Sequence, residues 1–505
     1  MGAGKTTAAW NAATALHTEP RDVDALLEQR LGKPIARIFT EDGEAAFRAT
    51  EEQLTLELLA DPATRAISLG GGAVTSERVR DALASCFVVW LDVPLDTAWQ
   101  RVKGSDRPLA RDRDAFGRLY DQRLPLYGGL ADIVLPASRS HAMADVLAAA
   151  EGLPEGIRML WATSASADYP AYIGPGLLGS FWPESVSGRR FVVTDGRVGG
   201  LYGDRVAEVS GRVAIMPGEQ SKTVAHAEIV WTELARAGMT RQDVVVALGG
   251  GVVGDLAGFC AATYQRGVDY VQVPTTLVAQ VDSAYGGKTG VDLAEAKNYV
   301  GAYHQPRAVI ADTDLLASLP QEEVAAGYAE VVKTALIDGG ELWERVRAGA
   351  DPLDPRIVRE CALTKLRVVA ADERDGGLRQ VLNLGHTVGH AIETVTGYAR
   401  YRHGEAVALG LLAALRLSGL PALRDEVAAL LAGRGLPTSL DDDVSVSDVV
   451  AATARDKKRL GSGPVPFVLL DGPGGARHGC AVAPEELNAA VRELAADHSL
   501  DSSAR

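Results

Sequence analysis

Short runs of apolar residues alternate with longer amphipathic stretches over much of the chain. Ala66–Leu69 and Phe87–Leu91 are short and continuous enough for buried strands, and the segments between them show helical periodicity. Further strand-like runs occur at Arg158–Trp161, Phe191–Thr194, Val213–Ile215 and Val244–Leu248. Strands that alternate with helices are typical of parallel architecture, so the pattern predicts an α/β fold.

Two changes in this pattern divide the chain. Residues 151–157 have the composition of a linker, and after about residue 316 the strand-like runs give way to long helical periodicity. We expect an α/β domain over 1–150, a linker over 151–157, an α/β domain over 158–315, an α-helical domain over 316–497 and a polar tail over 498–505. A cleft between the last two domains is the expected ligand site.

Composition and charge exclude several classes of protein. The 505 residues are 47% hydrophobic and 23% charged, which is close to globular averages, and the formal net charge of −15 argues against non-specific binding to nucleic acid or anionic membranes. No run approaches the ~18 apolar residues of a membrane helix, and no signal peptide is recognisable. The four cysteines form no CxxC pair. We therefore expect a cytoplasmic protein that acts on small molecules and keeps its thiols reduced.

The first residues form part of a phosphate-binding loop. Gly2 to Thr7 read GAGKTT, in which backbone N–H groups and a helix N-terminus would cradle phosphates, Lys5 would reach the outer phosphates and Thr6 would bind Mg²⁺. The full motif also has an earlier glycine and a buried strand that leads into the loop, and the sequence contains neither. A glycine-rich start that merely caps a helix is the alternative.

Later motifs give the first domain a family resemblance. In order and spacing, over nearly all of residues 1–150, the chain resembles shikimate kinase at Asp22-Val23-Asp24, Phe47–Glu51, Gly70–Gly72, Arg107-Pro108-Leu109 and Arg123–Tyr127. The resemblance implies a P-loop kinase-like parallel α/β domain that binds ATP and Mg²⁺. Because the loop lacks its preceding strand, we expect either an upstream start of the natural chain, or an impaired kinase, or a docking module without catalysis.

The same resemblance implies a role for each matching residue. It places the ATP phosphates at Gly2, Gly4, Lys5, Thr6 and Thr7, Arg107 on a lid over ATP, and Asp22 beside Thr6 at Mg²⁺. It places shikimate at Asp24, Arg48, Gly71 and Arg123, with Asp24 as the catalytic residue that accepts the hydroxyl proton. A guanidinium matches the substrate carboxylate in a two-pronged fork, and phosphoryl transfer requires mainly charge neutralisation and alignment.

The second half of the chain has its own glycine-rich turn. Val244–Leu248 leads into Gly249–Gly254, which satisfies GxGxxG and suits a backbone that approaches a pyrophosphate. The next strand-like run, Tyr270–Thr276, lacks the acidic residue that a standard dinucleotide site has at its end. We therefore expect a dinucleotide to bind here in a different manner.

Histidines and a carboxylate indicate a metal site further along. Three of the nine histidines, His386, His390 and His403, lie within 18 residues of one another, and Glu330 and Lys333 share one face of a predicted helix. One carboxylate with two imidazoles is a common catalytic zinc set. From spacing alone His386 and His390, at i and i+4, are the natural ligand pair, and a core histidine bonded to a backbone carbonyl is the alternative for each.

Numerous long motifs give the second half a close resemblance. From about Arg158 to about residue 495 the chain resembles 3-dehydroquinate synthase, at PGEQSK from Pro217, GGGVVGDLAGF from Gly249, QVPTTL from Gln272, GGKTGVD from Gly286, KN from Lys297, GAYHQP from Gly301, GYAEVVK from Gly327, LNLGHTVGHAIE from Leu382 and HGEAVA from His403. This family implies an α/β NAD-binding half, an α-helical metal-binding half and a homodimer.

The resemblance also implies the cofactor residues. Zn²⁺, or Co²⁺, would be bound by Glu330, His386 and His403, which leaves His390 as a nearby proton-handling residue. NAD would be held by Asp195, Glu219, Lys222, Gly250, Gly251, Asp255, Thr275 and Thr276, with Lys297 beside them.

A cluster of cations and amides would bind the anionic substrate. The resemblance assigns substrate contacts to Asp282, Lys288, Asn298, Lys333, Lys365, Arg379 and Asn383, and phosphate contacts to Lys297, to one of Lys457 and Lys458, and to Arg266 across a dimer interface. The implied reaction converts 3-deoxy-D-arabino-heptulosonate 7-phosphate into 3-dehydroquinate and phosphate, with NAD regenerated in each turnover. Two alternatives are a metal- and NAD-dependent polyol dehydrogenase and a different sugar-phosphate cyclase; the phosphate-binding lysines count against the dehydrogenase.

Overall fold

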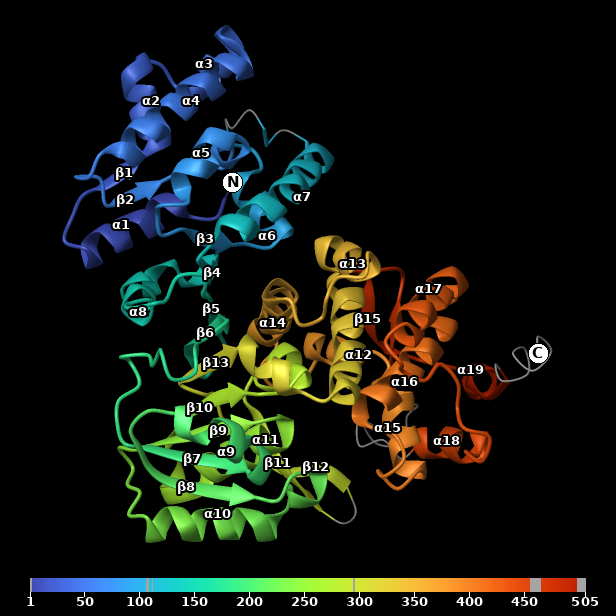
Figure 1. Cartoon of the computed structure of the whole chain (residues 1–505). Helices are drawn as coiled ribbons and strands as arrows, with labels where there is room; N and C mark the ends of the chain where they lie inside the picture. The colour runs from blue at the N-terminus through green and yellow to red at the C-terminus, as the bar shows by residue number, and fades with distance from the viewer. Residues whose placement is uncertain (1, 106–108, 111, 294–295, 455–464, 497–505) are drawn as a thin grey trace. The chain divides into compact units, whose positions relative to one another are not determined.

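The computed structural model describes residues 2–105, 109–110, 112–293, 296–454 and 465–496, and the chain divides into two compact units (Figure 1). Unit 1 comprises Met1–Ala162 with Phe181–Ser185, and unit 2 comprises Thr163–Ser180 with Val186–Arg505. Both units contain parallel strands and helices, which agrees with the α/β class predicted from the apolar runs.

Unit 1 contains short strands and eight helices in the part that the structure describes. Its helices are α1 (Lys5–Ala15), α2 (Val23–Leu31), α3 (Ile35–Glu41), α4 (Gly43–Ala60), α5 (Glu77–Leu83), α6 (Leu95–Val102), α7 (Arg113–Leu130) and α8 (Met143–Ala149). Its strands are β1 (Pro20–Asp22), β2 (Ala66–Ser68), β3 (Val89–Asp92), β4 (Ile133–Pro136) and β5 (Arg158–Thr163).

The strands of unit 1 form two separate parallel groups. β1 pairs with β2, and β3 pairs with β4, which in turn pairs with β5. Among the described strands, β2 has no partner on its other edge and neither does β3. Between these edges lies a mostly apolar cavity of about 550 Å³, lined by Ile67 and Val89 from the strands and by Ala3 and Lys5 at the start of the chain. The cavity therefore lies where a strand leading into the Gly2–Thr7 loop would run.

β5, which the sequence pattern placed at the start of the second domain, pairs with a strand of unit 1. Its residues Met159 and Leu160 pair with Ile133 and Val134 of β4, and the compact units divide after Ala162 rather than within residues 151–157. An apolar run predicts a buried strand but does not state which sheet the strand joins, and this accounts for the difference.

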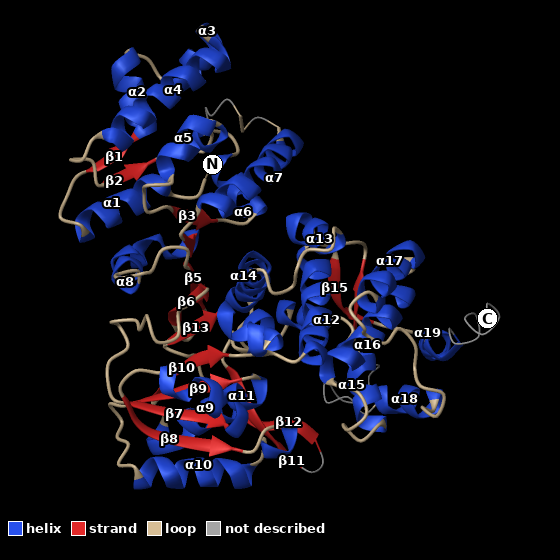
Figure 2. Ribbon diagram, in the orientation of Figure 1, coloured by secondary structure: helices blue, strands red, loops and turns tan. Residues whose placement is uncertain are grey.

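Unit 2 contains a parallel sheet covered by helices (Figure 2). Its strand order is β6-β13-β10-β9-β7-β8, from β6 (Asp168–Gly174), β7 (Arg190–Asp195), β8 (Val209–Ile215), β9 (Val244–Gly249), β10 (Asp269–Pro274) and β13 (Ala308–Asp312). Helices α9 (Gly196–Tyr202), α10 (Val224–Arg236) and α11 (Gly251–Thr263) accompany it, and β11 (Lys288–Leu293) and β12 (Ala296–Tyr303) form an antiparallel pair. β6 was not predicted, because Pro170 interrupts its apolar pattern.

The remainder of unit 2 is mainly helical, as the periodicity after residue 316 predicted. It contains α12 (Gln321–Asp338), α13 (Gly340–Arg347), α14 (Pro355–Ala371), α15 (His386–Val395), α16 (His403–Leu417), α17 (Pro421–Ala432), α18 (Val446–Thr453) and α19 (Pro484–Ala496). A small antiparallel hairpin of β14 (Phe467–Leu470) and β15 (Ala476–Cys480) interrupts the helices. Helix α12 is buried over most of its length, from Val324 to Ile337, so it forms the centre of this half.

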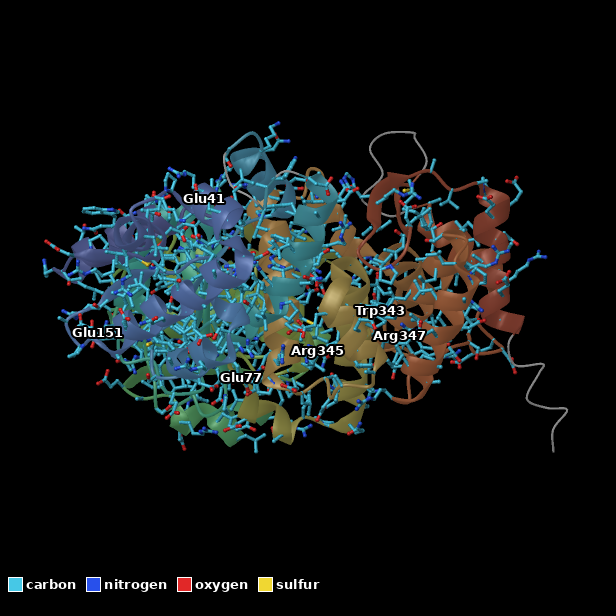
Figure 3. The ribbon with its side chains drawn as sticks, turned by 90° about the horizontal axis from the view of Figure 1, so that it is seen from above. Glu41, Glu77, Glu151, Trp343, Arg345 and Arg347 are labelled. Carbon is cyan, nitrogen blue, oxygen red and sulfur yellow. The ribbon has the colours of Figure 1, made fainter. Side chains whose placement is uncertain are left out.

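Charged side chains cover the surfaces of both units. Glu41, Glu77 and Glu151 are exposed on unit 1, and Arg347 on α13 forms an ion pair with Glu426 at 2.5 Å (Figure 3). The net negative charge of the sequence is therefore carried largely by solvated groups and does not describe the local field inside a cleft. No described helix combines the length and the hydropathy required to cross a bilayer.

Candidate functional site

A deep cleft separates the sheet and the helical half within unit 2. Its volume is about 840 Å³. The lining includes Asp195, Glu219, Lys222, Gly250, Gly251, Asp255, Thr275, Thr276, Asp282, Lys297 and Asn298 from the sheet half, and His390, Glu393 and His403 from the helical half. All residues expected to bind NAD therefore line one cavity, together with one of the expected metal ligands.

Glu330, His386 and His403 converge from three helices next to this cleft. The Nε2 atoms of His386 and His403 lie 3.6 and 3.3 Å from Oε1 of Glu330, and one ligand atom from each residue lies within 4.8 Å of the others. Glu330 is fully buried, and neither of its carboxylate oxygens accepts a well-directed hydrogen bond from a described residue. A buried carboxylate whose Oε1 faces two imidazole nitrogens fits a divalent cation.

Glycines bring the three helices close enough for this convergence. A Cβ atom added to Gly404 on α16 would lie 1.9 Å from the backbone oxygen of Ala326 on α12, and one added to Gly410 would lie 1.9 Å from the oxygen of Gly385, which precedes α15. The absence of side chains at these positions allows close contact between the backbones. The sequence HGEAVALG thus places His403 next to Glu330 through packing that any larger residue would prevent.

Electrostatics keep the carboxylate charged despite its burial. Burial raises the pKa of Glu330, but Lys333 and the two imidazoles outweigh burial and hold the pKa well below its usual value. Desolvation opposes the charge on His403, yet Glu330 and Glu393 raise its pKa to about 10. In the absence of a metal, a proton on His403 therefore balances the negative charge of Glu330. A divalent cation would take the place of that proton.

A second buried charge cluster adjoins the metal ligands. Nζ of Lys333 lies 3.3 Å from Oδ2 of Asp282, and Lys365 forms an ion pair with the other oxygen of the same carboxylate. Lys333 also pairs with Glu330. Burial lowers the pKa of Lys365 to about 8, although Asp282 opposes the shift. All three cluster members were expected to contact substrate, and the structure brings them together.

Lys222 lies among three carboxylates at the end of the cleft where NAD is expected to bind. Its Nζ lies 3.1 Å from Glu219, 3.2 Å from Asp255 and 3.9 Å from Asp292. These carboxylates outweigh the desolvation of the ammonium and raise its pKa. Gly250 immediately precedes α11, so the N–H groups of the first turn of that helix point into the cleft. The carboxylate oxygen Oδ1 of Asp195 caps α9 by accepting hydrogen bonds from the backbone N–H groups of Arg197 and Val198.

Arg379 and Lys288 belong to one anchored loop region. Arg379 is 1% exposed, and its guanidinium donates to the carbonyl oxygens of Glu373 at 2.6 Å and Gly286 at 3.0 Å. Nζ of Lys288 lies 2.5 Å from Asp375. Asn383 donates to the carbonyl of Gln380. These residues do not line the large cleft itself, and the 373–379 loop determines where their cationic groups lie.

Sequence reasoning did not single out Glu393, which the structure places between two of the predicted residues. Its Oε2 lies 3.4 Å from Nδ1 of His403 and its Oε1 lies 3.4 Å from Nζ of Lys297. The available signal was the helical spacing of Glu393 from His390, at i and i+3, but a surface carboxylate would have given the same pattern.

Three further predicted residues lie away from the cleft or outside the described residues. Arg266 is exposed in a turn after α11 with a φ of 70° and does not line the cavity. Lys457 and Lys458 lie outside the described residues.

Unit 1 has a separate cavity of about 760 Å³, lined by both charged and apolar residues. Its lining includes Thr6, Asp22, Asp24, Arg48, Glu51, Gly70, Gly71, Gly72 and Arg123. The hydroxyl of Thr6 donates to Asp22 at 2.6 Å, so the two residues expected at Mg²⁺ are neighbours. Arg107 lies outside the described residues.

A buried carboxylate orients Arg48 in this cavity. Glu51, which was not singled out from the sequence, is 2% exposed and lies 2.5 Å from a guanidinium nitrogen of Arg48. A Cβ at Gly72 would lie 2.1 Å from the same guanidinium, so the glycine run leaves the room that Arg48 occupies. Burial raises the pKa of Glu51, although Arg48 opposes it.

Comparisons with protein families agree with this division. Residues 1–152 match the family model of shikimate kinase, residues 212–326 match that of the 3-dehydroquinate synthase N-terminal domain, and residues 327–459 match that of its C-terminal domain.

Curated relatives match the second part of the chain. A 3-dehydroquinate synthase from Halorhodospira halophila is 45% identical over 352 residues, which cover 66% of this chain and 98% of the relative. Another from Symbiobacterium thermophilum is 44% identical, with 61% of this chain and 92% of the relative covered.

Solved structures resemble the same region. A 2-epi-5-epi-valiolone synthase from Streptomyces hygroscopicus, with NAD⁺ and Zn²⁺ bound, is 28% identical with a TM-score of 0.60 and covers 66% of this chain and 99% of its own. A 2-deoxy-scyllo-inosose synthase, complexed with carbaglucose-6-phosphate, NAD⁺ and Co²⁺, is 25% identical with a TM-score of 0.60 and covers 66% of this chain and 100% of its own.

Proposed function

Because the chain belongs to the 3-dehydroquinate synthase family and carries a shikimate kinase domain before it, we propose that the cleft of unit 2 is its synthase active site. The reaction converts 3-deoxy-D-arabino-heptulosonate 7-phosphate into 3-dehydroquinate and phosphate. The observation that carries the assignment is the convergence of Glu330, His386 and His403 beside a glycine-rich strand-to-helix turn in one cavity. We assign residues 158–315 to NAD binding and 316–497 to metal and substrate binding.

The enzyme uses NAD and a divalent metal, Zn²⁺ or Co²⁺. Glu330, His386 and His403 would bind the metal, and Lys222, Gly250, Gly251 and Asp255 are among the residues that would hold NAD, as would Asp195, Glu219, Thr275 and Thr276. When bound, the metal supplies Lewis acidity to a substrate hydroxyl and NAD supplies a reversible hydride acceptor.

The chain's own cations position an anionic substrate. Lys333 and Lys365 lie on either side of Asp282, so the pair retains net positive charge next to the metal ligands. Arg379, held by two backbone carbonyls, is restricted to one orientation, which suits a carboxylate. Lys297, at the start of β12, would contact the phosphate end together with one of Lys457 and Lys458 and with Arg266 of a second subunit. Asn298, Lys288 and Asn383 would contact the rest of the substrate.

His390 is the residue that would handle protons in the cleft. Its ring centroid lies 5.2 Å from that of His386 and 6.1 Å from that of His403, and it lines the cavity. Imidazoles commonly transfer protons in active sites. The surrounding helices exclude water from one side of the site, because Val388, Ala391 and Val407 are buried.

The test is phosphate release without net reduction of NAD. Purified protein with NAD and zinc should release one phosphate per substrate consumed, and absorbance at the NADH wavelength should return to its starting value. Steady accumulation of NADH from a polyol, with no release of phosphate, would assign the cleft to a dehydrogenase instead.

For unit 1 we propose phosphorylation of shikimate by ATP with Mg²⁺. Lys5 and the loop from Gly2 to Thr7 would hold the phosphates, Arg48 and Arg123 would hold the shikimate carboxylate, and Asp24 would accept the hydroxyl proton. The adjacency of Thr6 and Asp22 at 2.6 Å supports a Mg²⁺ site. ATP-dependent phosphorylation of shikimate that disappears in Lys5→Ala would support this role; inactivity of the unchanged chain would support a docking module.

We also propose a homodimer formed by unit 2, located in the cytoplasm. Arg266 is exposed on a turn away from its own cleft, as an arginine that completes a partner's site would be. Sedimentation equilibrium should give twice the chain mass of 53.1 kDa, and Arg266→Ala should raise KM for the phosphorylated substrate more than it changes zinc binding.

A further inference from the structure

A single buried carboxylate contacts both a metal ligand and a substrate-binding lysine. Glu393 on α15 is 3% exposed. One oxygen, Oε2, accepts from Nδ1 of His403 at 3.4 Å, and the other, Oε1, accepts from Nζ of Lys297 at 3.4 Å. The side chain is thus held between α16 and β12, two elements that are far apart in the sequence.

The contact between Glu393 and His403 determines which ring nitrogen of His403 is available to bind a metal. Nε2 of His403 faces Glu330 at 3.3 Å, on the side of the metal ligands, while Nδ1 faces Glu393. A neutral imidazole that donates from Nδ1 has its lone pair on Nε2, which is the form that binds a metal. Carboxylates in this position fix the tautomer and the ring orientation of metal-binding histidines, and they raise the basicity of the ligand.

The other oxygen of Glu393 positions the ammonium group of Lys297. Nζ of Lys297 also lies 3.8 Å from Glu219 and 4.3 Å above the ring of Tyr398. The ammonium is therefore held among one buried carboxylate, one half-exposed carboxylate and one aromatic face. Because Glu393 is the most buried of these partners, its charge contributes most to the position of the lysine.

A second metal site is the competing explanation. His390, Glu393 and His403 also present ligand atoms within 4.8 Å of one another. However, His403 would then have to bind one cation at each nitrogen, and Lys297 already places a positive charge 3.4 Å from Glu393. A divalent ion at that point would be repelled by the ammonium, so the geometry favours a hydrogen-bonding role.

Resting on the synthase function proposed above, we propose that Glu393 is a positioning residue that orients His403 for metal binding and couples the metal to Lys297. Both contacts use the same carboxylate, so a change at Lys297 alters the electron donation that His403 receives. Glu393 itself touches neither metal nor substrate in this arrangement. Loss of such a partner typically weakens metal binding ~10–100-fold.

Zinc affinity of the metal-free protein provides the principal test, since it requires no substrate. Competition with a chromophoric chelator should show zinc binding ~10–100-fold weaker in Glu393→Gln and weaker still in Glu393→Ala. The matched control is Glu405→Gln, on α16, because Glu405 is a partly exposed carboxylate two positions from His403 that pairs with Arg402. Unchanged zinc affinity in Glu393→Gln, with circular dichroism of the native fold, would overturn the proposal.

A double-mutant cycle tests the coupling to Lys297. If Glu393 serves both groups, the effects of Glu393→Gln and Lys297→Met on zinc affinity should be non-additive by at least threefold, and Lys297→Met alone should not weaken zinc binding. Additive effects would overturn the coupling. Binding of two zinc ions per chain, with one lost in Glu393→Gln, would identify Glu393 as a ligand and overturn the positioning role.

These outcomes are separate from the synthase assignment. If the unchanged chain binds zinc and releases phosphate while Glu393→Gln binds zinc normally, only the inference on Glu393 fails. If the unchanged chain binds zinc but releases no phosphate from the substrate, the proposed function fails and the zinc measurements on Glu393 still stand.

Discussion

Two lysines of unit 2, Lys333 and Lys222, are almost completely buried, and each is in contact with carboxylates of opposite charge. Lys333 is 1% exposed between Glu330 and Asp282, and Lys222 is 4% exposed among three carboxylates. Removal of one member would leave a buried charge uncompensated, which costs more than the pair contributes. Such an arrangement is typical of a functional site, where charges are held in place for a ligand rather than for stability.

The pKa of Lys365 predicts an alkaline limit to activity. Burial lowers this pKa to about 8, so the side chain is cationic below pH 8 and increasingly neutral above it. Because the neutral amine attracts an anionic substrate less, kcat/KM should fall above about pH 8. Arginine stays protonated in proteins, so Lys365→Arg should move this fall to higher pH. An alkaline limb that stays in place in Lys365→Arg would assign it to another group.

At the scale of elements, the positions of the proposed metal ligands depend on how closely α12, α15 and α16 pack. Gly404 and Gly410 on α16 contact the backbones of α12 and of the turn before α15. These contacts leave no space for a methyl group, and the helices can separate only by moving the ligands apart.

We therefore expect Gly404→Ala to impair both stability and metal binding. The added methyl would overlap the Ala326 oxygen, at a cost of ~1–3 kcal/mol in the free energy of unfolding, and zinc affinity should fall with it. Gly200→Ala on α9, where no atom lies within 4 Å, is the matched control and should stabilise by ~0.5–1 kcal/mol. Thermal unfolding and chelator competition would measure both; equal effects of the two substitutions would contradict the packing argument.

The unpaired edges of β2 and β3 in unit 1 lead to a second prediction at this scale, about the effect of an added strand. Addition of six Val and Ile residues and a glycine before Met1 should place a strand in the apolar cavity between β2 and β3, where Ala3 already lies. Burial of this strand should raise the melting temperature of unit 1 and tighten ATP binding, because the added strand would fix the loop from Gly2 to Thr7. An extension of equal length made of Ser and Gly is the control. Equal melting temperatures for the two extensions would show that the cavity does not take a strand.

At the scale of the whole molecule, the two candidate sites lie in different compact units. The two cavities lined by Lys5 and by Arg48 belong to unit 1, and the cleft beside Glu330, His386 and His403 belongs to unit 2. Each unit has its own buried core, for instance the cluster around Val23 and Leu27 in unit 1 and that around Val245 and Leu256 in unit 2. Each chemistry can therefore be removed without loss of the other.

We expect each of two substitutions to abolish one activity and to leave the other unchanged. Lys5→Ala should abolish ATP-dependent phosphorylation of shikimate and leave phosphate release by the synthase within twofold of the unchanged chain. Glu330→Gln should do the reverse, because it removes a charged metal ligand from unit 2 only. Both activities would be measured on the same preparations. Loss of both activities in either variant, with the fold intact, would show that the sites are coupled.

The sequence by itself determined the α/β class and the helical second half, and its motifs led to the residues that we propose for the chemistry, because apolar periodicity and long motifs are local properties of the chain. It did not determine that β5 joins β4, nor that Glu393 lies between His403 and Lys297, because contacts between distant segments depend on packing. Helical spacing and the family resemblance favoured different histidines as metal ligands. Spacing along one helix favoured His386 with His390, whereas the contact of α16 with α12 at Gly404 brings His403 to Glu330.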